Sequence, residues 1–395
     1  MSSAQIILLL LIGYLLFTFD KKQSYLPVPV LLVVLGIGLS FIPYFSSIEV
    51  TAKMIYHVFL PAILFTSAYN FSSANFRKNA GIITFLATIG IMATVAILGA
   101  VIFALSGPFV SLSFIGALVI ASILTPTDPV SVVSILEESS GSKKISSVVE
   151  GESLINDGTS IVIFSFLAGM LTQSKSFTVM NFVTDFLIVS LGGAALGIAF
   201  GWLMSKAVHY THHREYQVML SIVIAYGSFN LAELISVSGV LATVFSGIML
   251  SFEYGRSVRE AHFKDTLNGF WSIAELSVLS LLFLLIGIES AKFLQFNAWG
   301  FAFIIFAVSL LVRFAIIMGT TQFFKEWRKR MSWRESALIS WSGLKGSMSV
   351  YLILELQAKS SGDSDMIISL AFAAVLISLV IQSLGVSPLT KWLAK

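Results

Sequence analysis

The sequence predicts an all-α polytopic membrane protein with about 13 transmembrane helices. Hydrophobic residues make up 56% of the chain and charged residues only 11%, whereas a soluble domain carries about 25% charged residues. The mean hydropathy of +0.91 agrees with this composition. The apolar residues are also grouped into runs of roughly the 20 residues that a helix needs to cross a bilayer. A chain with this much apolar surface requires a lipid bilayer as its surroundings.

Thirteen apolar runs are expected to form the spans. They cover approximately residues 3–19, 27–45, 54–72, 80–106, 111–137, 148–172, 179–206, 215–235, 238–252, 266–290, 297–323, 333–357 and 364–385. The first run has no basic segment before it and no small-residue cleavage site after it. We therefore expect a retained first span rather than a cleaved signal peptide.

The basic residues indicate how these spans are oriented. With the N-terminus outside, two basic residues, Arg313 and Lys345, fall inside spans. Four more lie on the outer side: Lys53, Lys175, Lys292 and Lys359. The remaining 18 of the chain's 24 Lys and Arg residues are then cytoplasmic. Because cytoplasmic loops are enriched in basic residues, we predict a multi-pass protein of the cell (inner) membrane with its N-terminus outside and its C-terminus in the cytoplasm.

No loop is long enough to form a separate domain, so residues 1–395 are expected to be a single transmembrane domain without a soluble regulatory domain. The chain contains no phosphate-binding GxxxxGK[ST] loop, no GxSxG nucleophile elbow and no HExxH zinc motif. It has no Cys, and its net charge of +3 comes from basic residues in short loops. These features favour a secondary transporter over an enzyme, and predict neither a cofactor nor a nucleic-acid partner.

Two spans contain sequences that interrupt a helix. Span five includes Pro126 and Pro129, which each remove a backbone donor. Span twelve includes Gly343 and Gly346. The interruptions lie seven spans apart, which predicts two inverted six-helix repeats, about 27–206 and 215–385, whose broken helices cross at mid-membrane. Such repeats are typical of secondary transporters, although ordinary kinks and small-residue packing are the alternative.

Span six carries an unusual polar group in an otherwise apolar helix: Glu152, Ser153, Asn156 and Asp157. Residues four apart share one helix face, so these side chains form an acidic, oxygen-rich patch. A charge at membrane depth is costly, and such residues usually have a partner or a function.

The oxygen atoms of this patch and of the break in span five suit a small alkali cation. We expect an ion- and proton-binding site at Asp157, Asp128, Asn156, Ser153 and Thr127, with Na+ bound at Asp157, Asp128, Ser153 and Thr127. Burial disfavours the charged form of a carboxylate, so the same group can also bind a proton. The hypothesis is that cation and proton compete for Asp157 during alternating access, which predicts that transport fades at low pH.

The remaining charged residues of the spans have structural or secondary interpretations. Arg313 stays charged in the membrane, and Glu152 is its expected partner in a structural ion pair, with direct ion binding by Glu152 as the alternative. Lys345 is expected to balance charge at the break in span twelve. Glu275 in span ten is a secondary proton-site candidate or a hydrogen-bonded structural residue.

These residues resemble the monovalent cation/proton antiporters of the bacterial NhaP and animal NHE type. The resemblance covers nearly the whole chain and is carried by three sequences, Thr127-Asp128-Pro129, Gly151–Gly158 (GESLINDG) and Ser238–Ala242 (SGVLA). It implies a homodimer, a moving six-helix core, Asp157 as the carrier of ion and proton, and the Glu152–Arg313 pair. The Asn-Asp sequence at 156–157 implies the electroneutral branch of these antiporters.

The chain departs from this family pattern at Thr66, where many members carry Glu, and at Lys345, where Arg is usual. Thr66 is therefore a secondary candidate. The prediction is a secondary antiporter that exchanges Na+, with Li+ as another cargo, for H+ in an electroneutral one-to-one exchange. The alternatives are a K+/H+ antiporter of the same architecture, and a channel or receptor built on this scaffold.

Overall fold

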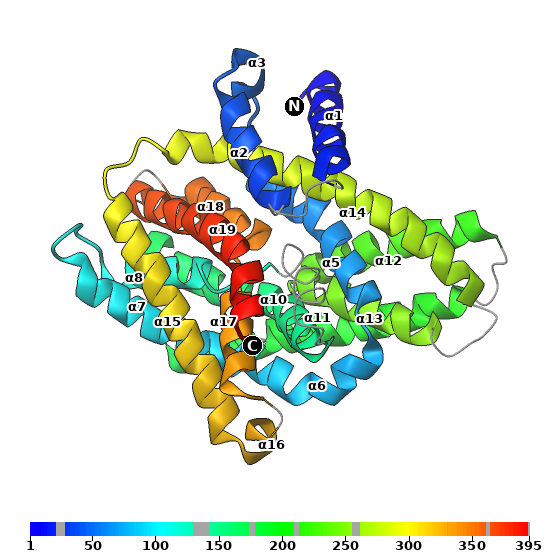
Figure 1. Ribbon diagram of the computed structural model, residues 1–395. Helices are drawn as coiled ribbons and strands as arrows, with labels where there is room; N and C mark the ends of the chain where they lie inside the picture. The colour runs from blue at the N-terminus through cyan, green and yellow to red at the C-terminus, as the bar shows by residue number, and fades with distance from the viewer. Residues whose placement is uncertain are drawn as a thin grey trace.

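The computed structural model describes residues 1–20, 28–128, 143–173, 178–208, 213–254, 261–329, 331–360 and 364–393. All regular structure in these ranges is helical, as predicted. The helices (Figure 1) are α1 (Ser3–Asp20), α2 (Val28–Ser40), α3 (Pro43–Ser46), α4 (Ala52–Met54), η1 (Ile55–Phe59), α5 (Leu60–Asn70), α6 (Ser73–Phe85), η2 (Leu86–Gly90), α7 (Ile91–Ser106), α8 (Phe114–Ile123), α10 (Lys143–Gln173), α11 (Val179–Val208), α12 (Arg214–Leu234), α13 (Gly239–Tyr254), α14 (Ala261–Ser290), η3 (Ala291–Phe293), α15 (Trp299–Phe323), α16 (Lys325–Arg328), α17 (Trp333–Trp341), α18 (Ser347–Lys359) and α19 (Asp365–Leu393).

Every predicted span overlaps a helix in these ranges. Seven helical segments are long and apolar enough to cross a membrane, namely Ala74–Ser106, Lys144–Thr172, Val179–Ala207, Arg214–Leu234, Asp265–Phe293, Trp299–Phe323 and Asp365–Thr390. Four shorter apolar helices are Ser3–Phe19, Val28–Ser40, Phe114–Ile123 and Gly239–Glu253. The chain is thus a multi-pass membrane protein.

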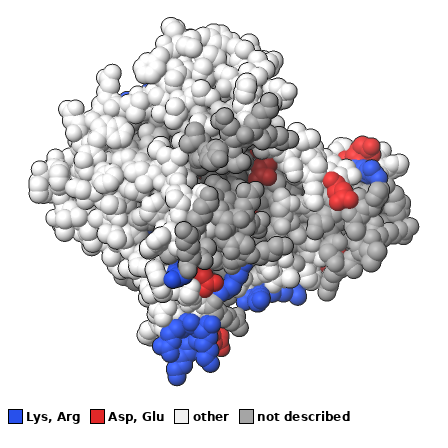
Figure 2. All heavy atoms as spheres, in the orientation of Figure 1, with Lys and Arg blue, Asp and Glu red and all other residues white. Residues whose placement is uncertain are grey.

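The distribution of charge on the surface agrees with this conclusion. Figure 2 shows one face of the molecule, on which Lys and Arg side chains gather at the end formed by α16, while most of the described remainder is uncharged. Lys325, Arg328 and Lys329 lie in and directly after α16 and are exposed. A largely uncharged surface with a basic end is what a lipid-embedded chain requires.

The helices pack as two bundles. The first bundle contains α1, α2, α5, α11, α12, α13 and α14, and the second contains α6, α7, α8, α10, α15, α17, α18 and α19. Figure 1 shows α12 and α13 on one side of the molecule, and α7, α8 and α15 on the other. Contacts of α10 with α11 and α13 join the two bundles.

The second bundle contains both predicted helix breaks. α8 begins at a Ser113 cap and ends at Ile123, and the chain continues without helix to Asp128. The rest of predicted span five, 129–137, lies outside the described residues. α17 ends at Trp341, and α18 begins only at Ser347.

The two breaks meet each other. The Asp128 N–H donates to the Leu344 carbonyl oxygen at 2.8 Å. The Ser349 hydroxyl donates to the Ile123 carbonyl oxygen at 2.7 Å, which satisfies an acceptor at the end of α8. The predicted crossing of the broken helices is therefore confirmed in the described part of span five. Irregular backbone is tolerated at membrane depth where protein groups satisfy it in this way.

Candidate functional site

Helix α10 carries the polar patch into the centre of the second bundle. Glu152, Ser153, Asn156 and Asp157 lie on two adjoining turns of this helix, and all four are buried. The non-helical end of span five lies against them, with Thr127 and Asp128 also buried. The structure therefore brings together the five predicted ion- and proton-binding residues, together with Glu152.

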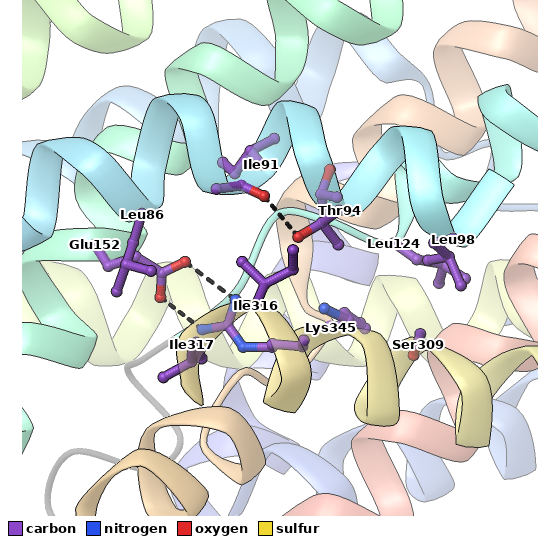
Figure 3. A pocket seen from close by; sticks show the side chains of 13 residues that line it. Leu86, Ile91, Thr94, Leu98, Leu124, Glu152, Ser309, Ile316, Ile317 and Lys345 are labelled. Carbon is purple, nitrogen blue, oxygen red and sulfur yellow. Dashed lines mark hydrogen bonds and ion pairs between the residues drawn. The ribbon is translucent and has the colours of Figure 1, made fainter. Parts of the chain in front are cut away.

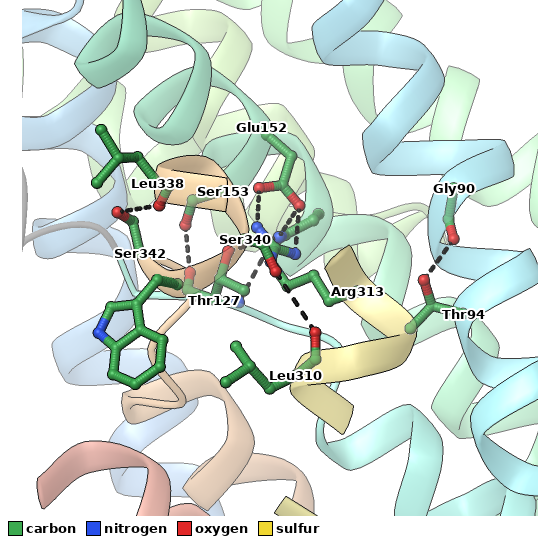
Figure 4. Close-up of polar contacts among 12 residues, drawn as sticks. Gly90, Thr94, Thr127, Glu152, Ser153, Leu310, Arg313, Leu338, Ser340 and Ser342 are labelled. Carbon is green, nitrogen blue, oxygen red and sulfur yellow. Dashed lines mark hydrogen bonds and ion pairs between the residues drawn. The ribbon is translucent and has the colours of Figure 1, made fainter. Parts of the chain in front are cut away.

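Two side chains of α10 hold the break of span five in place. The Ser153 hydroxyl donates to the Thr127 carbonyl oxygen. The Asn156 Nδ2 donates to Thr127 Oγ1 at 2.8 Å and to Glu152 Oε1 at 3.0 Å. Figure 4 shows Thr127 between Ser153 and the Glu152–Arg313 pair. Both hydrogens of the Asn156 amide are thus used within the protein, so Asn156 is placed to position Thr127.

Asp157 has an unmet hydrogen-bonding capacity. Its Oδ1 is buried and has no hydrogen-bond partner among the described residues. Asp157 lines a cavity of about 20 Å3 together with Thr127, Asp128 and Ser153. A buried acceptor without a partner costs free energy, and a proton or a cation at this oxygen would remove that cost.

The same cavity has polar lining residues that the sequence did not single out. They are Ser67 of α5 and Ser347, the first residue of α18. The family pattern pointed to Thr66, but the buried Thr66 hydroxyl donates to the Ala62 carbonyl oxygen at 2.8 Å and does not line the cavity. Since neighbouring residues on a helix face different directions, Ser67 rather than Thr66 faces the candidate site.

Gly346 allows the break in span twelve to approach Asp128. A Cβ atom built at Gly346 would lie 2.8 Å from Asp128 Cγ, closer than real Cβ atoms come to other atoms. The φ angle of Gly346 is −130°, which other residues also adopt. The absent side chain therefore provides the space for this close approach.

Arg313 of α15 makes a bidentate ion pair with Glu152. Its Nη1 donates to Glu152 Oε1 at 3.1 Å, and its Nη2 donates to Oε2 at 2.6 Å. Gly343 makes room for the guanidinium group, because a Cβ there would lie 2.7 Å from Arg313 Cζ. Paired parallel hydrogen bonds of this kind are among the strongest polar contacts in proteins.

Lys345 lies in the break of span twelve and is 5% exposed. It lines a second cavity of about 20 Å3, together with Glu152, Arg313, Thr94 and Ser309. Figure 3 shows Lys345 among the residues that line this cavity, with Ile316 and Ser309 near it. The Thr94 and Ser309 hydroxyls donate to backbone carbonyls of their own helices, so their lone pairs remain available to a cationic group.

Helix α19 fixes the other side of this break. Gln382 Nε2 donates to the Trp341 carbonyl oxygen at 2.7 Å, and Trp341 Nε1 donates to the Gln382 carbonyl oxygen at 3.0 Å. The Ser378 hydroxyl donates to Gln382 Oε1 and accepts from the Lys345 N–H at 3.3 Å. Ser378 and Gln382 are polar residues four apart in an apolar span, a signal that could have identified them from the sequence.

Glu275, like Thr66, is a predicted secondary residue that does not line the Asp157 cavity. It lies half-buried on α14 in the first bundle. It lines neither of the two small cavities, and in the described ranges it makes no hydrogen bond or ion pair.

The chain is similar to several known proteins. A family model described as "Sodium/hydrogen exchanger, transmembrane" matches residues 6–392. The chain is 33% identical over 389 residues to the Na(+)/H(+) antiporter NhaG of Bacillus atrophaeus, covering 94% of this chain and 71% of that relative. It is 30% identical over 401 residues to the Na(+)/H(+) antiporter NhaH of Halobacillus aidingensis, covering 98% and 96%.

Among solved structures, the fold is similar to that of the sodium proton antiporter MjNhaP1 from Methanocaldococcus jannaschii at pH 8. The TM-score is 0.75 at 18% sequence identity, and the alignment covers 96% of this chain and 98% of that one. At this level of identity the similarity establishes a common fold.

Proposed function

Because this chain belongs to the transmembrane sodium/hydrogen exchanger family, we propose that it is a secondary antiporter that exchanges Na+ for H+, with Li+ as another cargo. The observation that carries this proposal is the buried Oδ1 of Asp157, which lacks a hydrogen-bond partner among the described residues and faces a cavity of about 20 Å3. A proton or a dehydrated alkali cation is small enough for such a space, and each would satisfy the carboxylate.

The proposed cation ligands are Asp157, Asp128, Thr127 and Ser153. Alkali cations are hard and take oxygen ligands, and these four residues line one cavity. The hydrogen of the Ser153 hydroxyl is used on the Thr127 carbonyl oxygen, so the lone pairs of that hydroxyl can face a cation. Asn156 acts as a positioning residue, because its amide hydrogens are used on Thr127 and Glu152.

Competition for one carboxylate explains exchange. Asp157 holds either a proton or a cation, and in each of these forms its charge is neutralised for passage through the membrane interior. The empty, charged form remains where it is, so outward movement of one ion is coupled to inward movement of the other. One cation for one proton makes the cycle electroneutral, and movement of one bundle against the other supplies alternating access.

We further propose that the N-terminus lies outside and the C-terminus in the cytoplasm of the cell (inner) membrane, as the bias of basic residues predicts. Residues 1–395 act as a single transmembrane domain, with a first span at 3–19 and repeats at about 27–206 and 215–385. The working unit is a homodimer, as the resemblance to this family implies.

A K+/H+ antiporter is the nearest competing function. The names of the relatives, Na(+)/H(+) antiporters in both Bacillus atrophaeus and Halobacillus aidingensis, favour Na+ as the cargo. A channel or receptor on the same scaffold is the more distant alternative.

Dye-reported proton flux in proteoliposomes tests the proposal. Na+, Li+ and K+ are added in turn to vesicles containing the wild type or Asp157→Asn. We expect Na+- and Li+-dependent proton movement in the wild type and none in the variant. A response to K+ alone would favour the K+/H+ exchanger, steady current without a proton gradient would favour a channel, and a folded wild type that is silent with all three ions would refute antiport.

A further inference from the structure

A large cavity lies one helical turn from the candidate site. Its volume is about 620 Å3, and it lies between α10, α11, α18 and the corner that joins α12 to α13. Tyr56, Ile161 and Tyr351 line it. With the N-terminus outside, all of these segments lie towards the outer side of Asp157. We call this space the outer vestibule.

The outer vestibule and the small Asp157 cavity follow each other along the same three helical segments. Leu60, Asp157 and Ser347 line the small cavity. Leu60 lies four positions from Tyr56, and four positions also separate Asp157 from Ile161 and Ser347 from Tyr351. Four positions are about one turn of a helix. A single layer of side chains, formed by Tyr56, Ile161 and Tyr351, therefore separates the two spaces.

Two of the three residues in that layer are tyrosines whose rings are in contact. The rings of Tyr56 and Tyr351 are stacked, with centroids 4.6 Å apart and an angle of 14° between their planes. Both side chains are buried. Phe229 packs on Tyr56 at a centroid distance of 4.9 Å and an interplanar angle of 67°. Both rings line the vestibule and neither lines the small cavity.

The stack joins the two bundles. Tyr56 lies in η1, directly before α5 of the first bundle, and its hydroxyl donates to Glu233 Oε1 of α12 at 2.8 Å. Glu233 Oε1 also accepts from the Gly239 N–H at 3.0 Å. Tyr351 lies on α18 of the second bundle. Tyr56 is thus fixed to one bundle by a hydrogen bond, whereas its contact with Tyr351 can be broken when the bundles move apart.

The vestibule is suited to cations. Its lining includes three carboxylates, from Asp185, Glu233 and Glu355, and no Lys, Arg or His. Glu355 pairs with Lys359 at 2.9 Å, whereas Asp185 and Glu233 have no basic partner among the described residues. A cavity lined by one sign of charge raises the local concentration of ions of the opposite sign.

We propose that Tyr56 and Tyr351 form the outer gate of the ion path, closed in the structure described here, and that Glu233 holds Tyr56 in the closed position. This inference rests on the proposed function, since it assigns the route by which the cation reaches Asp157 from outside. Parting of the stacked rings opens the vestibule to the Asp157 cavity, and their return closes it.

Cysteine accessibility tests the gate without relying on transport. The chain has no Cys, so each introduced thiol is the sole target. Ser165→Cys places a thiol in the vestibule, and Ser67→Cys places one in the small cavity. A membrane-impermeant cationic thiol reagent, methanethiosulfonate-ethyltrimethylammonium, is applied to the outer face of intact cells. We expect fast reaction at position 165 and slow reaction at position 67.

Removal of a ring should reduce the difference in reaction rate between positions 165 and 67. Tyr351→Ala should accelerate the reaction of Ser67→Cys by about fivefold or more, since it removes one member of an aromatic pair and opens space. Tyr351→Phe is the matched control and should change little, because the Tyr351 hydroxyl makes no hydrogen bond in the described ranges. Tyr56→Phe keeps the ring but loses the hydrogen bond to Glu233. Ser67→Cys should then react at a rate between those of the wild-type and Tyr351→Ala backgrounds.

The gate is overturned if Ser67→Cys reacts at the same rate with and without Tyr351→Ala. It is also overturned if Ser165→Cys reacts no faster than Ser67→Cys. The unchanged rate of Ser165→Cys reports that each variant is folded. If Tyr351→Ala does not fold, Tyr56→Phe decides the question by the same comparison. If the labelling pattern is as expected but no cation-dependent proton flux is found, the result contradicts the proposed function and leaves the gate in place.

Discussion

The backbone N–H of Asp128 lies 2.8 Å from the carbonyl oxygen of Leu344, so the interruption of one helix is hydrogen bonded to the interruption of another. Unwound backbone in a membrane must find partners within the protein. Each break supplies a hydrogen-bond partner for the unwound backbone of the other. The same contact places the carboxylate of Asp128 at the crossing. A change at the break of span twelve is therefore expected to disturb Thr127 and Asp128, the proposed cation ligands at the break of span five.

Gly346→Ala should impair transport more than folding. The new Cβ would overlap the Asp128 carboxylate and displace it from the cavity, and overpacking of this kind costs about 1–3 kcal/mol. We expect the half-saturating Na+ concentration in proteoliposomes to rise. Gly319→Ala on α15 is the matched control, since a Cβ there meets nothing within 4 Å. Equal affinities in the two variants would show that the close approach of Gly346 is not functional.

The pH dependence of transport should follow competition at Asp157. As pH falls and protons occupy the carboxylate, the Na+ concentration for half-maximal exchange should rise, approaching about tenfold for each pH unit because the proton concentration rises tenfold. At alkaline pH the turnover should fall again, because the return step needs a proton. Initial rates measured at a series of pH values and Na+ concentrations test both the acid and the alkaline effect. A half-saturating concentration that is independent of acid pH would exclude a shared site.

The Glu152–Arg313 pair should stabilise the fold of the second bundle. Arg313→Ala leaves a buried Glu152 without its bidentate partner, and breaking a buried pair costs about 3–5 kcal/mol. We expect a lower thermal midpoint in detergent and a lower yield of folded protein. The exchanged pair, Glu152→Arg with Arg313→Glu, should recover part of the loss. An unchanged midpoint for Arg313→Ala would show that the pair does not act structurally.

Much of this architecture could be predicted from the sequence because membrane constraints are strong. The bilayer sets the length of each span, and the prolines of span five and the glycines of span twelve interrupt helices for simple steric reasons. The acidic patch of α10 could also be predicted, because a carboxylate such as Asp157 is costly in an apolar helix unless it has a partner or a function.

The remaining features depended on tertiary geometry. Whether Thr66 or Ser67 faces the cavity is set by the rotation of α5 about its axis, which a nearly uniform apolar helix does not reveal. The direction of Lys345 into the Glu152–Arg313 cavity follows from the path of unwound backbone, for which periodicity gives no rule. The stacking of Tyr56 on Tyr351 joins residues almost three hundred positions apart and has no local signal.

Gln382 offers a final test of how the broken helix is held. Gln382→Leu keeps a similar volume but removes the hydrogen bonds to the Trp341 carbonyl oxygen and from the Ser378 hydroxyl. A buried polar group left without its partner costs about 1–3 kcal/mol, so the thermal midpoint should fall. Transport at saturating Na+ should also fall, because Lys345 and Gly346 belong to the break that begins after Trp341. Gln357→Leu, at an exposed position of α18, is the control. A variant at 382 that matches this control in both measurements would show that α19 does not position the break.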